Sequence, residues 1–93
     1  MKKTPYNRIP NCLRKYRKAR GLKQSNVAKI LRIKSTSLIS RWEKGVCLPN
    51  TLNSFKLSIL YRTLIVALFI DLYRTLKEEI LKREKEVFRM RHA

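Results

Sequence analysis

The stretch QSNVAKILRIKSTSLISRWEKG, residues 24–45, most constrains what this chain can fold into. Its apolar residues recur at helical spacing over residues 24–31 and again over residues 36–44. Residues 32–35 join the two segments without a glycine. Two short helices joined by so tight a connection form a helix-turn-helix, so the sequence predicts this motif. Its apolar residues are Val27, Ala28, Ile30, Leu31, Ile39 and Trp42.

The second predicted helix carries short polar side chains and a forked cation on its outer face. Side chains of these kinds reach base edges in a DNA major groove. We therefore expect this helix to read bases, while nearby polar and basic residues contact phosphates. The predicted base-reading residues are Thr36, Ser37, Leu38, Ser40 and Arg41. The predicted phosphate contacts are Lys15, Lys23, Gln24, Ser25, Lys34, Ser35 and Lys44.

The charge of the chain favours a nucleic-acid partner. The 93 residues hold 23 Lys and Arg against six Asp and Glu, a net charge of +17. Residues 1–45 contain fourteen of the cations and a single acid, Glu43. Such an excess repels itself in a folded domain, and a polyanionic partner would relieve it. Double-stranded DNA is the expected partner.

Other classes of function find little support. Cys12, Cys47 and His92 are too far apart for a zinc site or a disulfide framework, so we expect free thiols, no metal and no cofactor. The folded half has no paired carboxylates and no glycine-rich phosphate loop, so the protein is predicted not to be an enzyme. The apolar window at residues 64–70 is too short to cross a bilayer, and the first residues lack the core of a signal peptide. We expect a cytoplasmic, nucleoid-associated protein.

The chain divides into three predicted parts. Residues 1–10 should form a basic flexible arm, residues 11–73 the DNA-binding domain, and residues 74–93 an extension of the last helix. Asn11 is expected to cap a helix over residues 12–20, and Gly21 should supply its left-handed stop. The residues predicted on its buried side are Leu13, Tyr16 and Ala19.

The second half is predicted to contain two more helices. Leu48 should anchor a loop in the core, and a helix over residues 52–61 should follow. Its predicted core residues are Leu52, Phe55, Ile59 and Leu60. Thr63 is a plausible cap for a last, long helix that starts at Leu64 and finishes the core with its first two turns.

The motifs LRKYRKARGLKQ, SNVAKIL, SLISRWEKG and LPN occur in an order that resembles the Cro and repressor type of helix-turn-helix, the XRE family. The resemblance covers roughly residues 11–73 and implies an all-α, five-helix, lambda-repressor-like DNA-binding domain. It also implies a phosphate contact by Gln24 and a buried ion pair between Arg17 and Glu43. Glu43 lies beside Trp42, where an unpaired carboxylate would be costly. Arg32 replaces the usual glycine of the turn, and there is one more residue than usual between Ala28 and Trp42.

The end of the last helix carries an interrupted heptad pattern. A seam of apolar residues, broken by Arg83, suggests a homodimer that binds a roughly palindromic site. The predicted dimerisation residues are Tyr73, Leu76, Ile80, Val87 and Met90. A single helix folded back on the helix over residues 52–61 is the alternative.

The leading interpretation is a sequence-specific DNA-binding regulator of repressor type. Two other functions remain open: an antitoxin or phage-type protein whose C-terminal helix grips a partner, and a non-specific RNA-binding or ribosome-associated protein.

Overall fold

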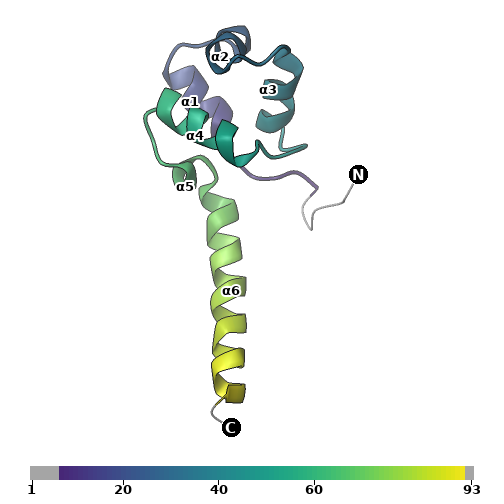
Figure 1. Cartoon of the computed structure of the whole chain (residues 1–93), viewed down its shortest axis with the longest axis vertical. Coiled ribbons are helices and arrows are strands. Elements are labelled where there is room, and N and C mark those ends of the chain that lie inside the picture. The colour runs from purple at the N-terminus through teal and green to yellow at the C-terminus, as the bar shows by residue number, and fades with distance from the viewer. Residues whose placement is uncertain (1–6, 92–93) are drawn as a thin grey trace.

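The computed structural model describes residues 7–91 as an all-helical chain without a strand. Five short helices form a compact head, and the sixth projects away from it along the 56 Å long axis (Figure 1). The predicted all-α class is therefore confirmed. The elements are α1 (Leu13–Ala19), α2 (Gln24–Leu31), α3 (Thr36–Glu43), α4 (Thr51–Leu60), α5 (Ile65–Leu68) and α6 (Ile70–Arg91). No helix within residues 7–91 has the length and apolar character that crossing a membrane requires.

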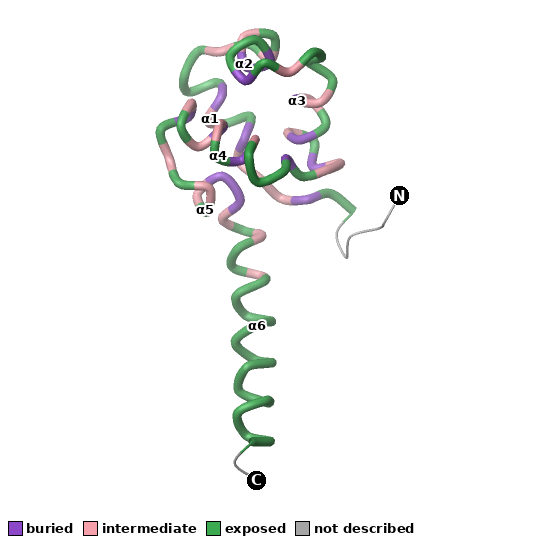
Figure 2. The backbone as a smooth tube through the Cα atoms, viewed as in Figure 1, coloured by how far each residue is buried: buried purple, intermediate pink, exposed green. Residues whose placement is uncertain are grey.

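The core lies inside the head, where buried segments of five helices meet (Figure 2). Helix α2 packs against α3 and α4, and α1 packs against α3. Burial of large apolar side chains supplies most of the stability of such a small domain. The largest fully buried side chains are Leu13, Val27, Ile39, Leu57 and Leu68.

The connection between α2 and α3 turns without glycine. Arg32 adopts a left-handed conformation, with φ 58° and ψ 47°, at the end of α2. Such a conformation costs a residue with a Cβ about 1–2 kcal/mol. The N–H of Ile33 donates to the carbonyl of Ala28 at 2.8 Å, and Lys56 on α4 donates to the carbonyl of Leu31 at 3.3 Å. These bonds satisfy carbonyls at the end of α2 and help to hold the turn.

Residues 7–10 pack against the head, contrary to the predicted flexible arm. Residues 1–6 of that arm lie outside the described residues. Ile9 is buried, and its N–H donates to the carbonyl of Gly45 at 2.9 Å. Helix α1 follows, and Ala19 on it is exposed rather than buried. The segment just before α1 therefore belongs to the head.

Helix α4 is rotated from its predicted orientation. Leu52, Phe55 and Ile59 are 64%, 56% and 74% exposed, whereas Leu57 on the opposite side is 1% exposed. Apolar residues occur on several faces of α4, so periodicity alone cannot select the buried one. In the preceding loop, Pro49 is buried, whereas Leu48 is 49% exposed and is not anchored in the core as predicted.

The predicted last helix is broken into α5 and α6 at Phe69, whose φ of −130° and ψ of 42° are not helical. Thr63 is not the cap, because Leu64 occupies that position and makes no side-chain cap bond. The break turns Phe69 into the core, where it is 8% exposed. The carbonyl of Leu68 accepts the N–H of Cys12 at 2.8 Å. This contact joins α5 to the start of α1.

Candidate nucleic-acid interface

Helix α3 presents a polar outer face to solvent. Thr36, Ser37 and Arg41 are exposed, and Ser40 is half-buried. Leu38 is half-buried and packs against the core, so less of its side chain can reach a ligand. Ile39 and Trp42 anchor the inner face at 1% and 3% exposure. The fold therefore directs polar side chains outward from a rigidly packed helix.

The N-terminus of α3 is closed by a serine cap. The hydroxyl of Ser35 accepts the N–H of Ser37 at 3.1 Å, and the two hydroxyls lie 2.7 Å apart. A serine cap satisfies one of the N–H groups that a helix start leaves unpaired. The same end of α3 follows the exposed Lys34. An anion placed here would meet a positive helix terminus and a nearby cation.

Asn11 holds the C-terminus of α3. Its side-chain amide donates to the carbonyls of Trp42 at 3.1 Å and Glu43 at 3.3 Å. The amide also donates to the carbonyl of Ile9 at 3.0 Å, while its oxygen accepts the N–H of Leu13. Sequence reasoning predicted Asn11 as the cap of α1, but Cys12 occupies the cap position, and Asn11 precedes it. The contacts of Asn11 to α3 were not predicted. A long-range contact of this kind leaves no local signal in the sequence.

Arg17 and Glu43 form an ion pair that links α1 to the end of α3. Nε of Arg17 lies 2.6 Å from Oε2 of Glu43, and the two side chains are only 11% and 5% exposed. Nη2 donates to Oε1 at 3.0 Å, and Nη1 donates to the carbonyl of Leu22 at 2.9 Å. The hydrogen bond to Glu43 raises the pKa of Arg17 above its ordinary value. The pair has the fork geometry that makes Arg–carboxylate contacts strong.

Gln24 belongs to the same network. Its side-chain nitrogen donates to Oε1 of Glu43 at 3.1 Å. Gln24 is the first residue of α2, so the network connects α1, α2 and α3. The sequence predicted a phosphate contact here, and the structure adds a positioning contact to Glu43. The amide oxygen and the second N–H take no part in that bond.

A hollow of about 340 Å³ lies between the three linked helices. Exposed cations from α1 and from the end of α3 line it beside the ion pair. The lining residues are Arg14, Arg17, Gln24, Ser40, Glu43 and Lys44. Arg14 was not among the predicted contacts, although it belongs to the basic run of α1. The donors and cations here suit a phosphate oxygen.

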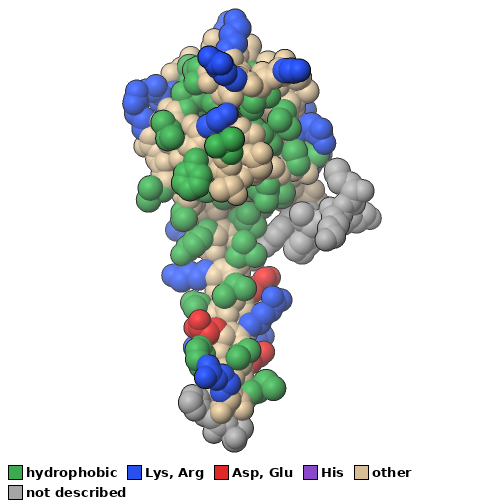
Figure 3. All heavy atoms as spheres, viewed as in Figure 1, with side chains coloured by type: hydrophobic (Ala, Val, Ile, Leu, Met, Phe, Trp, Pro, Cys, Tyr) green, Lys and Arg blue, Asp and Glu red, His purple; other side chains and the backbone are tan. Residues whose placement is uncertain are grey.

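The remaining predicted phosphate contacts lie on the surface around the motif. The exposed residues of this set are Lys15, Lys23, Ser25, Lys34 and Ser35. In the face shown in Figure 3, basic side chains are spread over the head, and the acidic side chains in view lie on α6. This distribution leaves the head strongly positive. It suits the approach of a polyanion.

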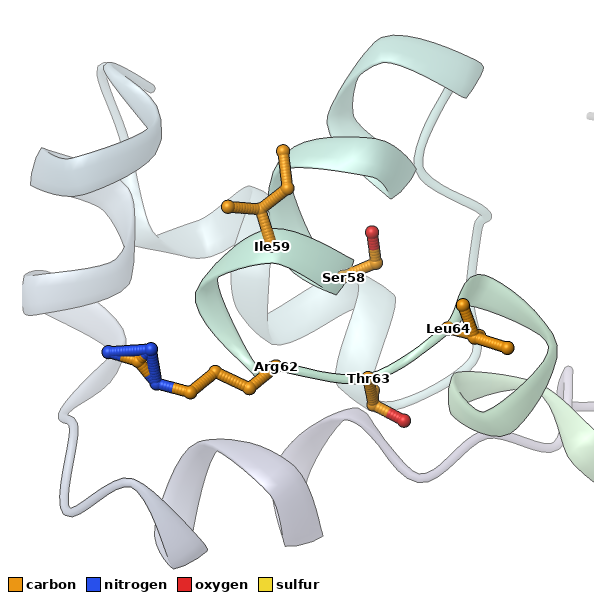
Figure 4. A pocket seen from close by; sticks show the side chains of 5 residues that line it. All are labelled: Ser58, Ile59, Arg62, Thr63 and Leu64. Atoms are coloured by element: carbon orange, nitrogen blue, oxygen red, sulfur yellow. The ribbon is translucent and has the colours of Figure 1, made fainter.

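A second hollow lies at the end of α4, and no residue of α2 or α3 lines it. It measures about 480 Å³ and is lined by Ser58, Ile59, Arg62, Thr63 and Leu64 (Figure 4). The side chain of Arg62 extends away from Thr63 and Leu64. Within residues 7–91 there is no group of three or more His, Cys, Asp or Glu that could hold a metal ion. The hollow offers no evident acid–base pair.

The fold and its fixed outer helix define a helix-turn-helix DNA-binding protein. A family model described as helix-turn-helix matches residues 13–65, more than half of the chain. The chain belongs to this family, the Cro/repressor (XRE) type of helix-turn-helix protein. No curated protein and no solved structure matches the chain.

Proposed function

We propose that the protein is a transcriptional regulator of repressor type that reads a specific DNA sequence with α3 in the major groove. The observation that carries this proposal is the outer face of α3, where Thr36, Ser37 and Arg41 are exposed. The helix beneath them is held at its C-terminus by Asn11 and by the Arg17–Glu43 pair. Rigid placement matters because base contacts need defined geometry. Such a regulator would act on DNA in the cytoplasm, in association with the nucleoid.

Base contacts and phosphate contacts have separate roles in the proposed complex. Arg41 is suited to a bidentate contact with guanine, and the hydroxyls of Thr36, Ser37 and Ser40 to other base edges. Leu38 is left with an apolar contact such as a thymine methyl. Phosphate contacts set the register and supply salt-dependent affinity. The proposed phosphate-contacting residues are Lys15, Lys23, Gln24, Ser25, Lys34, Ser35 and Lys44. We add Arg14 because it lines the same hollow as Gln24 and Lys44.

The proposed active form is a homodimer paired through α6. The residues Tyr73, Leu76, Ile80, Val87 and Met90, called the α6 seam below, are 44–77% exposed. Exposed apolar groups in such a row favour a protein partner. A twofold dimer would set two α3 helices on major grooves roughly 34 Å apart or a multiple of it, on a palindromic site. Helix α6 projects from the head (Figure 1) and has no buried residue, which supports pairing through α6 over the fold-back on α4 considered from the sequence.

The test begins with selection of bound sites from random duplexes. The selected and scrambled duplexes are then titrated at two salt concentrations. We expect specific binding to exceed non-specific binding by about a thousandfold, with both falling steeply as salt increases. Equal affinity for both duplexes would overturn the proposal and favour the RNA-binding function. Dependence on a second protein for operator binding would favour the antitoxin or phage-partner function.

A further inference from the structure

An apolar groove of about 260 Å³ opens at the base of α6. It lies between the loop before α4, helix α5 and the first turns of α6, and its wall is almost wholly apolar. The lining includes Leu48, Pro49, Val66, Phe69, Tyr73 and Leu76. The last two residues also begin the α6 seam. The groove and the seam therefore form one continuous apolar surface.

The far end of α6 carries apolar side chains that could fill such a groove. Val87 and Met90 are 54% and 77% exposed, and α6 has no buried residue. The helix of 22 residues is about 33 Å long, so this end cannot reach the groove of its own chain. A second copy of the chain can bring the same end to it.

We propose that the α6 helices of two copies pair antiparallel, so that residues 87–90 of each copy lie in the groove at the base of the other. The proposal rests on the homodimer proposed above and adds its orientation. It assigns the groove an occupant and gives each end of the seam an apolar contact.

The spacing of the seam allows this arrangement. Positions a and d of a heptad alternate along a pairing helix, and in an antiparallel pair a residues meet d residues of the second copy. One register sets Tyr73 opposite Met90 and Leu76 opposite Val87. Ile80 then faces Arg83, and the same contacts repeat by symmetry. The layers at both ends, which are the ones beside the two grooves, are apolar.

The charge of the heads favours the antiparallel orientation. Residues 1–69 contain sixteen Lys and Arg and one acid, whereas residues 70–93 contain seven and five. A parallel pair would set two such heads side by side at one end of the dimer. Charges separated by more than about 10 Å are largely screened at ordinary salt, so moving the heads to opposite ends removes most of this repulsion.

Arg83 points to the same orientation. In a parallel, in-register pair it would face Arg83 of the second copy inside the seam. In the antiparallel register it faces Ile80 instead. It also lies on the side of the seam where Glu79 of one helix approaches Glu86 of the other. Arg83 therefore separates the two carboxylates in that register.

Charged residues beside the seam distinguish the two orientations, because one charge reversal should have opposite effects on the stability of an antiparallel and of a parallel dimer. The antiparallel register places Lys77 beside Glu84 of the second copy, which is attractive. The parallel register places Glu79 beside Glu84, which is repulsive. Glu84→Lys should therefore weaken an antiparallel dimer and strengthen a parallel one. Glu78 lies on the helix face opposite the seam, so Glu78→Lys is a control with the same change in charge.

Sedimentation equilibrium at low salt on the full chain provides the measurement. We expect Glu84→Lys to raise the dimer dissociation constant roughly fivefold above the control, since it reverses two exposed charge pairs. Adding Lys77→Glu should restore the dissociation constant of the parent chain. Tighter association of Glu84→Lys, or a monomeric parent chain at tens of micromolar, would overturn the antiparallel pairing.

Disulfide trapping gives an independent measurement. Tyr73→Cys and Met90→Cys are made separately in full chains that carry Cys12→Ser and Cys47→Ser. Equal mixing should give a disulfide between the two variants, and neither alone should form one with itself. Self-linked dimers of each variant, or no link in the mixture, would overturn the inference. Binding of each variant to a half-site duplex is measured separately, so a failed orientation is distinguishable from a failed DNA-binding function.

Discussion

The guanidinium of Arg17 on α1 donates to both carboxylate oxygens of Glu43 at the end of α3. Nε lies 2.6 Å from Oε2, and Nη2 lies 3.0 Å from Oε1. Glu43 is the last residue of α3, so this contact fixes the helix that carries the proposed base-reading residues. Gln24 approaches the same carboxylate from α2. Three helices thus share one buried acid, and the orientation of α3 depends on it.

Removal of either partner should destabilise the fold strongly. Arg17→Ala or Glu43→Ala should each lower the free energy of unfolding by about 3–5 kcal/mol, because the surviving charge is left buried and unpaired. The double variant should lose less than the sum of the single losses. Chemical denaturation of the four proteins measures this coupling. Additive losses would show that the two side chains do not depend on each other.

Replacement of Arg41 should reduce sequence preference, whereas replacement of Lys15 should reduce affinity for all duplexes. Arg41→Ala should cost roughly 1–3 kcal/mol on the selected site and relax the preference at one base pair. Lys15→Ala should weaken selected and scrambled duplexes alike and reduce the salt dependence. Competition titrations with single-base variants of the site separate these outcomes. An equal loss on all duplexes for Arg41→Ala would assign it to phosphate.

The two glycines provide a matched test of why a glycine is needed. Both have positive φ, 68° at Gly21 and 74° at Gly45. A Cβ on Gly21 would meet nothing within 4 Å, whereas a Cβ on Gly45 would lie 2.4 Å from the carbonyl oxygen of Ile9. Gly21→Ala should cost about 1 kcal/mol from backbone strain alone. Gly45→Ala should cost clearly more, and thermal unfolding of both variants checks the difference.

Tyr61 has a buried hydroxyl for which the described residues supply no hydrogen-bond partner. Tyr61→Phe should therefore leave stability unchanged or raise it by about 1 kcal/mol. Burial, the largest cause, raises the pKa of Tyr61 to about 12. Because the unfolded phenol ionises near pH 10, this residue makes the protein less stable as pH rises from about 10 to 12. Denaturation across this range should show a smaller loss for Tyr61→Phe.

Leu76 and Leu81 test whether the seam is the dimer contact. Both are leucines of α6 with 44% exposure, but only Leu76 lies on the seam. Leu76→Lys should give a folded monomer that binds a two-half-site operator much more weakly while its half-site affinity barely changes. Leu81→Lys should behave like the parent chain. Light scattering and titrations on both kinds of duplex compare the two, and equal effects would remove the seam from the interface.

The sequence by itself determined the helix-turn-helix. Its two helices were recognisable because their signals are local: apolar residues recur at helical spacing over residues 24–31 and 36–44, and only residues 32–35 join the two segments. Such signals act within one or two turns of a helix and need no distant partner. The Arg17–Glu43 contact was expected from the family resemblance and from the scarcity of acids around Glu43.

Only the tertiary structure decided the rest. The rotation of α4 could not be read because leucine, isoleucine and phenylalanine occur around much of its circumference. The break at Phe69 and the burial of Ile9 depend on contacts with residues far away in the sequence. Asn11 binds carbonyls more than thirty residues away, at Trp42 and Glu43. A single sequence carries no local signal for such contacts, because each joins a residue to a distant segment of backbone that lies close to it only after the chain has folded.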